Sequence, residues 1–181
     1  SRVLVNLIGI PSLLAIIYAG DSFNNLPLFS VFIAVVLFLG AREISSLTIG
    51  KGGKPIIVLL WLFLAILQID RHPEVSWDIP IYLLILGITL IAMVLEVFRR
   101  EAKPLLNISI LVFAFIWLGV MLGALGTLRN LPHIGFKVTI ALFLSVWICD
   151  TSAFFFGKRF GMKKILPLVS PNKTWFGTIS G

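Results

Sequence analysis

Long apolar runs, separated by short connectors that carry most of the charge, constrain this sequence more than any other feature. Each run approaches the twenty or so residues that an α-helix needs to cross the hydrocarbon core of a bilayer. Hydrophobic residues make up 59% of the 181 residues and charged residues only 13%, whereas a soluble domain usually carries about a quarter charged residues. The sequence therefore predicts an all-α fold, a polytopic transmembrane helical bundle.

Six spans are predicted, with the start of a seventh. They cover residues 3–19, 28–47, 55–69, 79–98, 105–125 and 136–156, and a further span begins at Trp175. No linker divides the chain, so we expect a single transmembrane domain over 1–181. Residues 1–135 would hold the N-terminal spans, and residues 136–181 the sixth span, a lysine-rich loop and the start of the next span.

The basic residues alternate between connectors in a way that predicts orientation. The odd-numbered connectors hold twelve of the 15 Lys and Arg residues: Arg2, Arg42, Lys51, Lys54, Arg99, Arg100, Lys103, Lys158, Arg159, Lys163, Lys164 and Lys173. The even-numbered connectors hold only Arg71, Arg129 and Lys137. Because cytoplasmic loops are enriched in Lys and Arg, we expect the N-terminus and the loop at 157–174 to be cytoplasmic. This alternation also explains the net charge of +7 through lipid headgroups, without a nucleic-acid partner.

A single carboxylate, Asp150, lies within the sixth predicted span. A charged side chain in a membrane helix is costly unless it faces a partner or a water-filled cavity, so it marks a candidate functional site. An interhelical hydrogen bond, or a span end close to the surface, would also account for it. The neighbouring Thr151 and Ser152 fit a wet cavity.

Two polar segments follow this span. The first, Gly157-Lys-Arg-Phe-Gly-Met-Lys-Lys164, is either a charge run that anchors the helix end or a site that attracts polyphosphate. The second is Ser170-Pro-Asn-Lys-Thr-Trp-Phe-Gly177, in which Pro171 is expected to fix a turn and Asn172 to form a turn or helix cap. Lys173 and Thr174 place an ammonium and a hydroxyl at the start of a helix, where anions bind readily. Residues alone leave a phosphate-binding loop and an ordinary anchored loop equally open.

Both polar segments resemble one known family. Asp150-Thr-Ser-Ala-Phe-Phe-Phe-Gly-Lys-Arg-Phe-Gly161, followed by Ser170-Pro-Asn-Lys-Thr-Trp-Phe-Gly177, is similar to the middle of bacterial phosphatidate cytidylyltransferases, also called CDP-diglyceride synthases. Phe176 departs from the family pattern, which has Glu there. The resemblance also implies an aspartate-rich C-terminal signature beyond Gly181, so we expect a piece of a longer chain that is inactive alone.

The resemblance implies a transferase of phospholipid biosynthesis. It would join CTP and phosphatidate into CDP-diacylglycerol and pyrophosphate in the bacterial inner membrane, with Mg²⁺ as cofactor. Lys173 and Asp150 are the implied catalytic residues, and Asp150 is also a candidate metal ligand beside carboxylates expected beyond Gly181. The implied substrate-binding residues are Ser170, Pro171, Asn172, Lys173, Thr174, Gly177, Lys158 and Arg159.

Three other interpretations stay open at this point. The chain could belong to a CTP-dependent lipid-alcohol kinase, to a transporter that uses Asp150 as an ion site, or to a membrane subunit without chemistry. A homodimer is a fair expectation for such proteins, although no residue here indicates one.

Overall fold

The computed structural model describes residues 2–20, 28–72, 74–75, 77–167 and 170–181. Within it the chain forms two compact units, Ser1–Phe136 (unit 1) and Lys137–Gly181 (unit 2). Each unit is described by itself.

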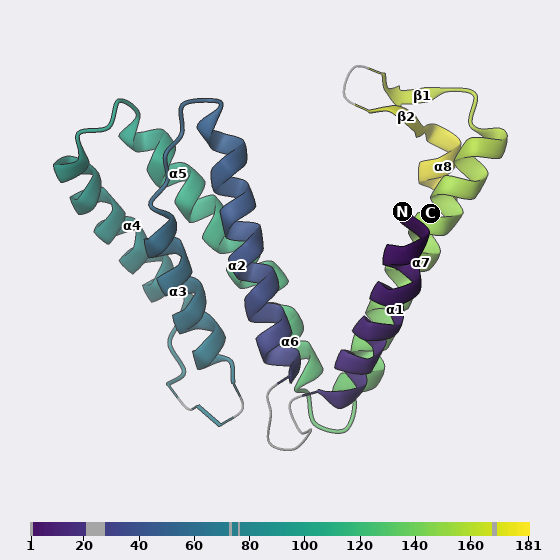
Figure 1. Ribbon diagram of the computed structural model, residues 1–181, viewed down its shortest axis with the longest axis horizontal. Helices are drawn as coiled ribbons and strands as arrows, with labels where there is room; N and C mark the ends of the chain where they lie inside the picture. Colours follow the sequence, from purple (N-terminus) through teal and green to yellow (C-terminus); the bar gives the residue numbers. More distant parts are fainter. Residues whose placement is uncertain (1, 21–27, 73, 76, 168–169) are drawn as a thin grey trace. The chain divides into compact units, whose positions relative to one another are not determined.

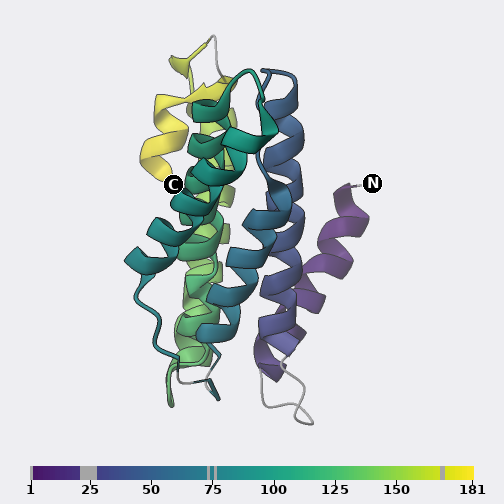
Figure 2. The same ribbon diagram turned by 90° about the vertical axis from the view of Figure 1, so that its left-hand side faces the viewer.

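Unit 1 consists of helices. Their bounds are α1 Arg2–Ala19, α2 Leu28–Ile49, α3 Ile57–Asp70, α4 Ile81–Arg99, α5 Pro104–Ala114, the π-helix η1 Phe115–Leu122 and α6 Ala124–Arg129. Helices α2, α3, α4 and α5 run side by side (Figures 1 and 2). Apolar segments are expected to form helices in lipid, because a helix satisfies every backbone polar group within its own segment.

The core of unit 1 lies where α2, α3 and the α5–η1 segment meet. Along α2 the buried residues recur every fourth position, at Phe29, Ile33, Leu37 and Ala41, which places them on one helix face. On α3, Phe63 meets Phe115 of η1 edge to face, with ring centroids 6.2 Å apart. Leucine and isoleucine side chains from α3 and α4 fill the remaining core.

Outside this core, the helices expose large apolar side chains. On α4 alone these include Leu83, Leu86, Leu90, Val94 and Val97. Among the described residues, four helical segments are long and apolar enough to cross a membrane: Leu28–Ile49, Ile81–Arg99, Pro104–Arg129 and Gly135–Phe160. Ile8–Ala19 and Ile57–Asp70 are shorter apolar helices. The prediction of a helical membrane bundle is therefore confirmed.

One span departs from regular α-helix. Between α5 and α6 the chain adopts the π-helix η1, whose wider turn leaves backbone carbonyls displaced from the usual ladder. Arg71, just after α3, donates to two of them, with Nη1 2.7 Å from the Gly119 oxygen and Nη2 3.3 Å from the Val120 oxygen. The guanidinium thus ties the end of α3 to the backbone of η1.

Unit 2 contains most of one long helix, a hairpin and a short helix. Helix α7 spans Gly135–Phe160, strands β1 (Lys164–Leu166) and β2 (Ser170–Thr174) pair antiparallel, and α8 spans Trp175–Ser180. The strands are two small exceptions to the predicted all-α fold. The predicted loop from 157 was wrong in its start, because α7 continues through Phe160.

The expectation of a turn or cap at Pro171 and Asn172 was also wrong. Both residues lie in β2, whose extended backbone pairs with β1. The cap of α8 is Thr174, two residues after Asn172. Threonine suits this position because its hydroxyl accepts a bond from a free N–H of the first turn.

Candidate functional site

A cleft of about 870 Å³ lies in unit 2 between α7, the hairpin and α8, and we call it the α7–α8 cleft. Its lining consists of polar, glycine and apolar residues from all these elements: Cys149, Asp150, Ala153, Phe154, Gly157, Lys158, Gly161, Lys164, Ser170, Asn172, Lys173, Thr174, Gly177, Thr178 and Gly181. The volume is in the range of small-molecule sites.

Helix α7 contributes one acidic, one aromatic and one basic side chain to the cleft. Asp150, Phe154 and Lys158 follow one another at intervals of four residues, so they lie on one helix face. The Lys158 ammonium lies 5.9 Å from the centroid of the Phe154 ring. Asp150 is exposed, and within the described residues it forms no salt bridge with any lysine. Its carboxylate is therefore open to the cleft.

Small residues on α7 allow α8 to pack closely. Ala153 and Gly157 lie four residues apart on one face of the helix. Gly177 of α8 lies against both of them, and Gly181, just after α8, lies against Ala153. A Cβ added at Gly177 would lie 2.8 Å from the Ala153 oxygen and 3.0 Å from the Gly157 Cα. Such small residues let helix backbones approach each other in membrane proteins. This contact fixes the floor of the cleft.

Thr174 joins the hairpin to both helices. Its side chain is buried, and its hydroxyl accepts from the Gly177 N–H at 3.2 Å. The same hydroxyl lies 3.5 Å from the Gly157 oxygen, to which it donates. Both hydrogen-bonding capacities of Thr174 are thus used inside unit 2, where they hold β2 and α8 against α7.

The hairpin presents alternate residues of β2 to the cleft. Ser170, Asn172 and Thr174 all line it, as expected for residues two apart in a strand. On β1, Lys164 lies directly opposite Thr174. Lys173 also lines the cleft. The site therefore gathers three lysines, Lys158, Lys164 and Lys173, around one carboxylate.

This composition favours an anionic ligand with several phosphate oxygens. Lysine ammonium groups are donors with three protons each and no acceptor, and they bind phosphate as point charges. The side-chain hydroxyl and amide of Ser170 and Asn172 add neutral hydrogen-bonding groups. An uncharged or cationic ligand would leave the lysines without counter-charge.

Most of the residues predicted for the site do meet in this cleft. Asp150, Lys158, Ser170, Asn172, Lys173, Thr174 and Gly177 all line it. Arg159 does not, and its guanidinium lies over the Phe160 ring, 5.8 Å from the centroid. The side chain of Pro171 lies outside the described part of the structure.

Phe176, the departure from the family pattern, lies outside the cleft lining. Its ring packs against Phe160 with centroids 5.5 Å apart. Phe160 in turn stacks on Phe156 at 6.3 Å. In this chain, position 176 therefore belongs to an aromatic cluster and supplies no charge to the site.

Sequence reasoning missed Lys164 as a cleft residue. Lys158, Arg159, Lys163 and Lys164 form one basic run in the sequence, and nothing in that run separates cleft lysines from solvent-facing ones. The hairpin register makes the distinction. If a pair of strands had been predicted on the two sides of Pro167, the pairing would have placed Lys164 beside Thr174 and so in the cleft.

The structure also bears on the expected metal. Within the described residues no group of three His, Cys, Asp or Glu side chains could hold a metal ion. Asp150 is the only carboxylate in residues 137–181. Mg²⁺ often takes only one or two protein carboxylates and completes its octahedron with water and substrate phosphates, so Asp150 fits the role of one such ligand.

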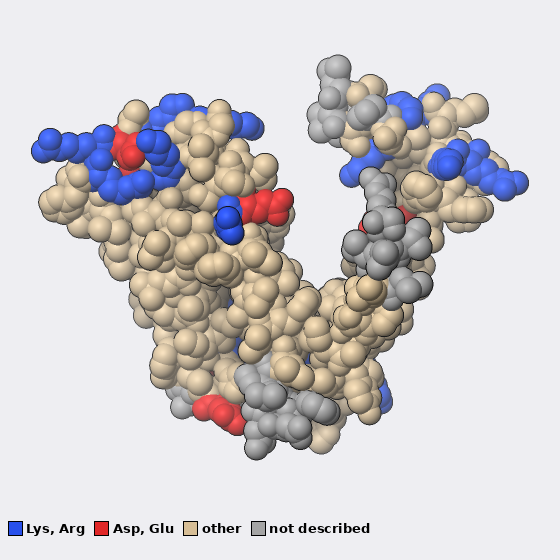
Figure 3. Space-filling model, in the orientation of Figure 1, with Lys and Arg blue, Asp and Glu red and all other residues tan. Residues whose placement is uncertain are grey.

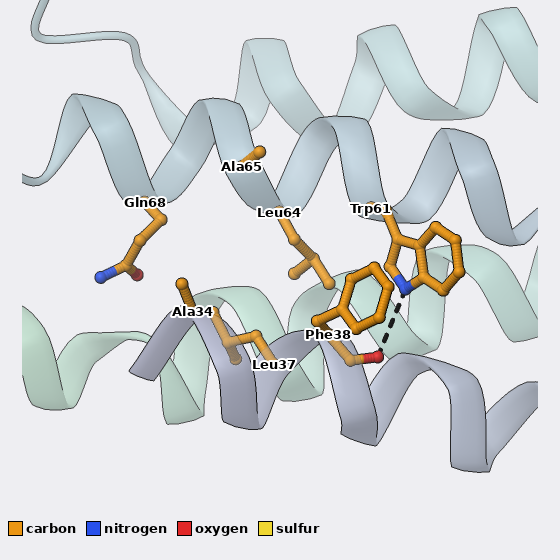
Figure 4. A pocket seen from close by; sticks show the side chains of 7 residues that line it. All are labelled: Ala34, Leu37, Phe38, Trp61, Leu64, Ala65 and Gln68. Atoms are coloured by element: carbon orange, nitrogen blue, oxygen red, sulfur yellow. Dashed lines mark hydrogen bonds between the residues drawn. The ribbon is translucent and has the colours of Figure 1, made fainter. Parts of the chain in front are cut away.

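Unit 1 holds a smaller hollow of about 160 Å³ between α2 and α3 (Figure 4). Its walls are apolar apart from Gln68, and the Trp61 indole N–H closes one end by donating to the Phe38 oxygen at 3.3 Å. The Gln68 Oε1 atom is buried without a partner among the described residues. No charged group lines this hollow, so it offers no chemistry comparable to that of the cleft.

A polar cluster closes the end of unit 1 at the α2–α3 and α4–α5 connections. Asn107, which is buried, donates to Glu96 Oε2 at 3.1 Å and accepts from the Lys54 backbone N–H at 2.6 Å. Arg99 forms an ion pair with Glu96, and Lys54 one with Glu101 at 3.1 Å. Figure 3 shows Lys and Arg side chains gathered with acidic ones at an end of this unit. The mutual pairing of these groups indicates a structural cluster.

Comparison with known proteins places the chain among cytidyl-transferring proteins. The family model described as "Cytidylyltransferase family" matches residues 1–181. A phosphatidate cytidylyltransferase of Haemophilus influenzae is 38% identical over 84 residues, 44% of this chain and 28% of the relative. Relatives of the same name from Bacillus subtilis and Brucella abortus are 27% identical over 128 residues and 43% identical over 58 residues.

Those two alignments cover 69% and 32% of this chain. The matched segments of the three relatives span 28%, 46% and 22% of the relatives' own lengths, so the chain corresponds to less than half of each. No solved structure matches the chain significantly.

Proposed function

Because this chain belongs to the cytidylyltransferase family, we propose that the intact protein transfers CMP from CTP to phosphatidate, giving CDP-diacylglycerol and pyrophosphate. The observation that carries this proposal is the α7–α8 cleft, which is lined by three lysines and one carboxylate and lies beside a helix long and apolar enough to cross a membrane. The relatives' printed name, phosphatidate cytidylyltransferase, supports the choice of substrates.

The proposed reaction sets a clear electrostatic task. An oxygen of the lipid phosphate attacks the α-phosphorus of CTP, and the bond from that phosphorus to the oxygen bridging to the β-phosphate breaks. The bridging oxygen and its electron pair leave with pyrophosphate. Both reactants are anionic, so catalysis rests on charge neutralisation and in-line positioning, and no protein nucleophile is needed.

Lys173 and Lys158 are proposed to bind phosphate oxygens, with Ser170 and Asn172 donating neutral hydrogen bonds from β2. Thr174 has its hydroxyl committed to Gly177 and Gly157, so we assign it a positioning role. Gly177 serves by allowing the close approach of α8 to α7. Pro171 remains a predicted substrate-binding residue.

Mg²⁺ remains the expected cofactor. The chemistry that Mg²⁺ would supply when bound is neutralisation of part of the charge that develops on pyrophosphate. Asp150 would be its ligand from this chain, and the carboxylate would otherwise orient the lysines around it. Its exposure to the cleft supports either role.

We further propose that the protein lies in the bacterial inner membrane with the cleft on the cytoplasmic side. The apolar helices make it a membrane protein, and the segregation of Lys and Arg supports the orientation. CTP would then reach the cleft from the cytosol. A homodimer stays an expectation.

The test uses the intact protein in phospholipid nanodiscs with Mg²⁺, CTP and phosphatidate. Pyrophosphate and CDP-diacylglycerol should form in equal amounts, and Lys173→Ala should lower kcat/KM by about 100-fold or more, as expected for loss of a charged hydrogen bond to the transition state. Unchanged turnover in Lys173→Ala would overturn the site. Release of CDP would instead indicate a kinase, and substrate uptake without turnover a transporter.

A further inference from the structure

The basic run at the end of α7 separates into two kinds of residue. Lys158 and Lys164 line the α7–α8 cleft, whereas Arg159 and Lys163 do not. All four are exposed, so exposure alone does not distinguish them. The difference is geometric: it arises from the helix face for Lys158 and from the strand register for Lys164.

The position of Lys164 is fixed through its strand partner. Lys164 pairs with Thr174 across the hairpin, and directly opposed residues project to the same face of a sheet. Thr174 is itself buried against α7, where a Cβ added at Gly161 would lie 2.6 Å from the Thr174 Cβ. Next to this pair, the Trp175 N–H donates to the Lys163 oxygen at 3.0 Å. The backbone that carries Lys164 is therefore held against α7.

The charge of Lys164 is not compensated by its neighbours. Within the described residues it forms no ion pair, and Asp150, the only acid of residues 137–181, pairs with none of the cleft lysines. A lysine held at the edge of a cleft without a counter-charge is suited to a phosphate group.

We propose that Lys164 is a phosphate-binding residue of the α7–α8 cleft and acts beside Lys173. This inference rests on the proposed function and deepens it, because it assigns a role to a residue that the sequence left within an undifferentiated basic run. The phosphate belongs to CTP or to the lipid headgroup. The chemistry that Lys164 recognises is the same in both cases.

Lys164→Ala in the intact protein should raise the KM for one substrate about 10- to 100-fold, the cost of a lost hydrogen bond to a charged group. Lys163→Ala is the matched control, since it removes the same charge one residue away and keeps the backbone oxygen that Trp175 uses. Lys164→Arg should retain most of the affinity. Whichever of CTP and phosphatidate shows the raised KM identifies the phosphate that Lys164 contacts.

A second measurement keeps this inference separate from the proposed reaction. Binding of inorganic pyrophosphate to the protein in nanodiscs, measured by calorimetry, needs no turnover and should weaken in Lys164→Ala but not in Lys163→Ala. If the wild type binds pyrophosphate in this Lys164-dependent way and yet forms no CDP-diacylglycerol, the proposed function fails and the inference stands. Equal losses in both variants, or a Lys164→Ala variant that changes neither pyrophosphate binding nor the KM of either substrate, would overturn the inference.

Discussion

Individual residues in unit 2 divide into those that place a charged group in the cleft and those that hold the backbone in position. Lys158, Lys164 and Lys173 bring charge to the cleft, whereas Thr174 spends both capacities of its hydroxyl on Gly177 and Gly157. A motif read as one binding loop thus contains at least one residue whose task is to fix the backbone. The two tasks have different experimental signatures.

Thr174→Val should destabilise the start of α8. The substitution keeps the shape of the side chain but leaves the Gly177 N–H without its acceptor, and loss of an N-cap costs about 1 kcal/mol. Hydrogen exchange at the Gly177 amide should become faster, and the unfolding midpoint in detergent should fall. Thr174→Ser keeps the hydroxyl and should behave like the wild type. Unchanged exchange in Thr174→Val would contradict the capping role.

At this scale the sequence predicted the identities of the site residues better than their roles. Asp150 and Lys173 could be singled out because a carboxylate within an apolar run is costly unless it is used, and a lysine beside a helix start favours anions. The N-cap of α8 could not be singled out from the sequence, because Asn172 and Thr174 are both good capping residues. Lys164 was missed because its place depends on pairing with Thr174 of the next strand.

The elements that shape the cleft meet through small residues. Ala153 and Gly157 on α7 face Gly177 and Gly181, and the two backbones come so close that a larger side chain would not fit between them. Element packing, more than any one side chain, sets the width of the cleft.

Gly177→Ala and Gly9→Ala should have opposite effects on stability. Alanine is the better helix former by about 1 kcal/mol, and a Cβ at Gly9 would meet nothing within 4 Å. At Gly177 the Cβ would lie 2.8 Å from a backbone oxygen, which must move away, and such overpacking costs about 1–3 kcal/mol. Thermal unfolding in detergent should show a lower midpoint for Gly177→Ala only. A raised midpoint there would refute the close contact.

Among the elements, the spans were predictable and the irregular segments were not. Apolar runs mark helices in a bilayer because no other open structure satisfies the backbone there, and α2 begins at Leu28 as predicted. Arg71 donates to carbonyls of the π-helix η1 that lie 48 and 49 residues away in the chain. Local sequence does not contain that contact.

For the molecule as a whole, the membrane determines what is exposed and where charge lies. The lipid-facing helices expose apolar side chains, and the polar cluster of Glu96, Asn107 and Arg99 lies at the end of unit 1 where the odd-numbered connectors meet. Composition and charge alternation were sufficient to predict this organisation. The cluster itself was not predicted, because it joins α4, α5 and the connector between α2 and α3, which are separate in the sequence.

The orientation can be tested with single cysteines in a Cys149→Ser background. Lys51→Cys should react with a membrane-impermeant maleimide only after bacterial cells are permeabilised, because its connector is basic and expected in the cytoplasm. Glu74→Cys, in the connector after α3, should react in intact cells. Both positions are exposed, so accessibility within the protein is matched. The reverse labelling pattern would overturn the orientation.

The length of α7 bears on how the two substrates of the proposed reaction would reach the cleft. Its 26 residues extend about 39 Å at about 1.5 Å each, roughly 9 Å more than a hydrocarbon core of about 30 Å. Asp150, Phe154 and Lys158 lie on successive turns toward the C-terminal end of α7, so the helix sets how far each of them lies from its N-terminal end. In the proposed reaction, this end of α7 would lie near the level of the lipid phosphates outside that core, so phosphatidate would keep its acyl chains in the bilayer while CTP would approach from the water.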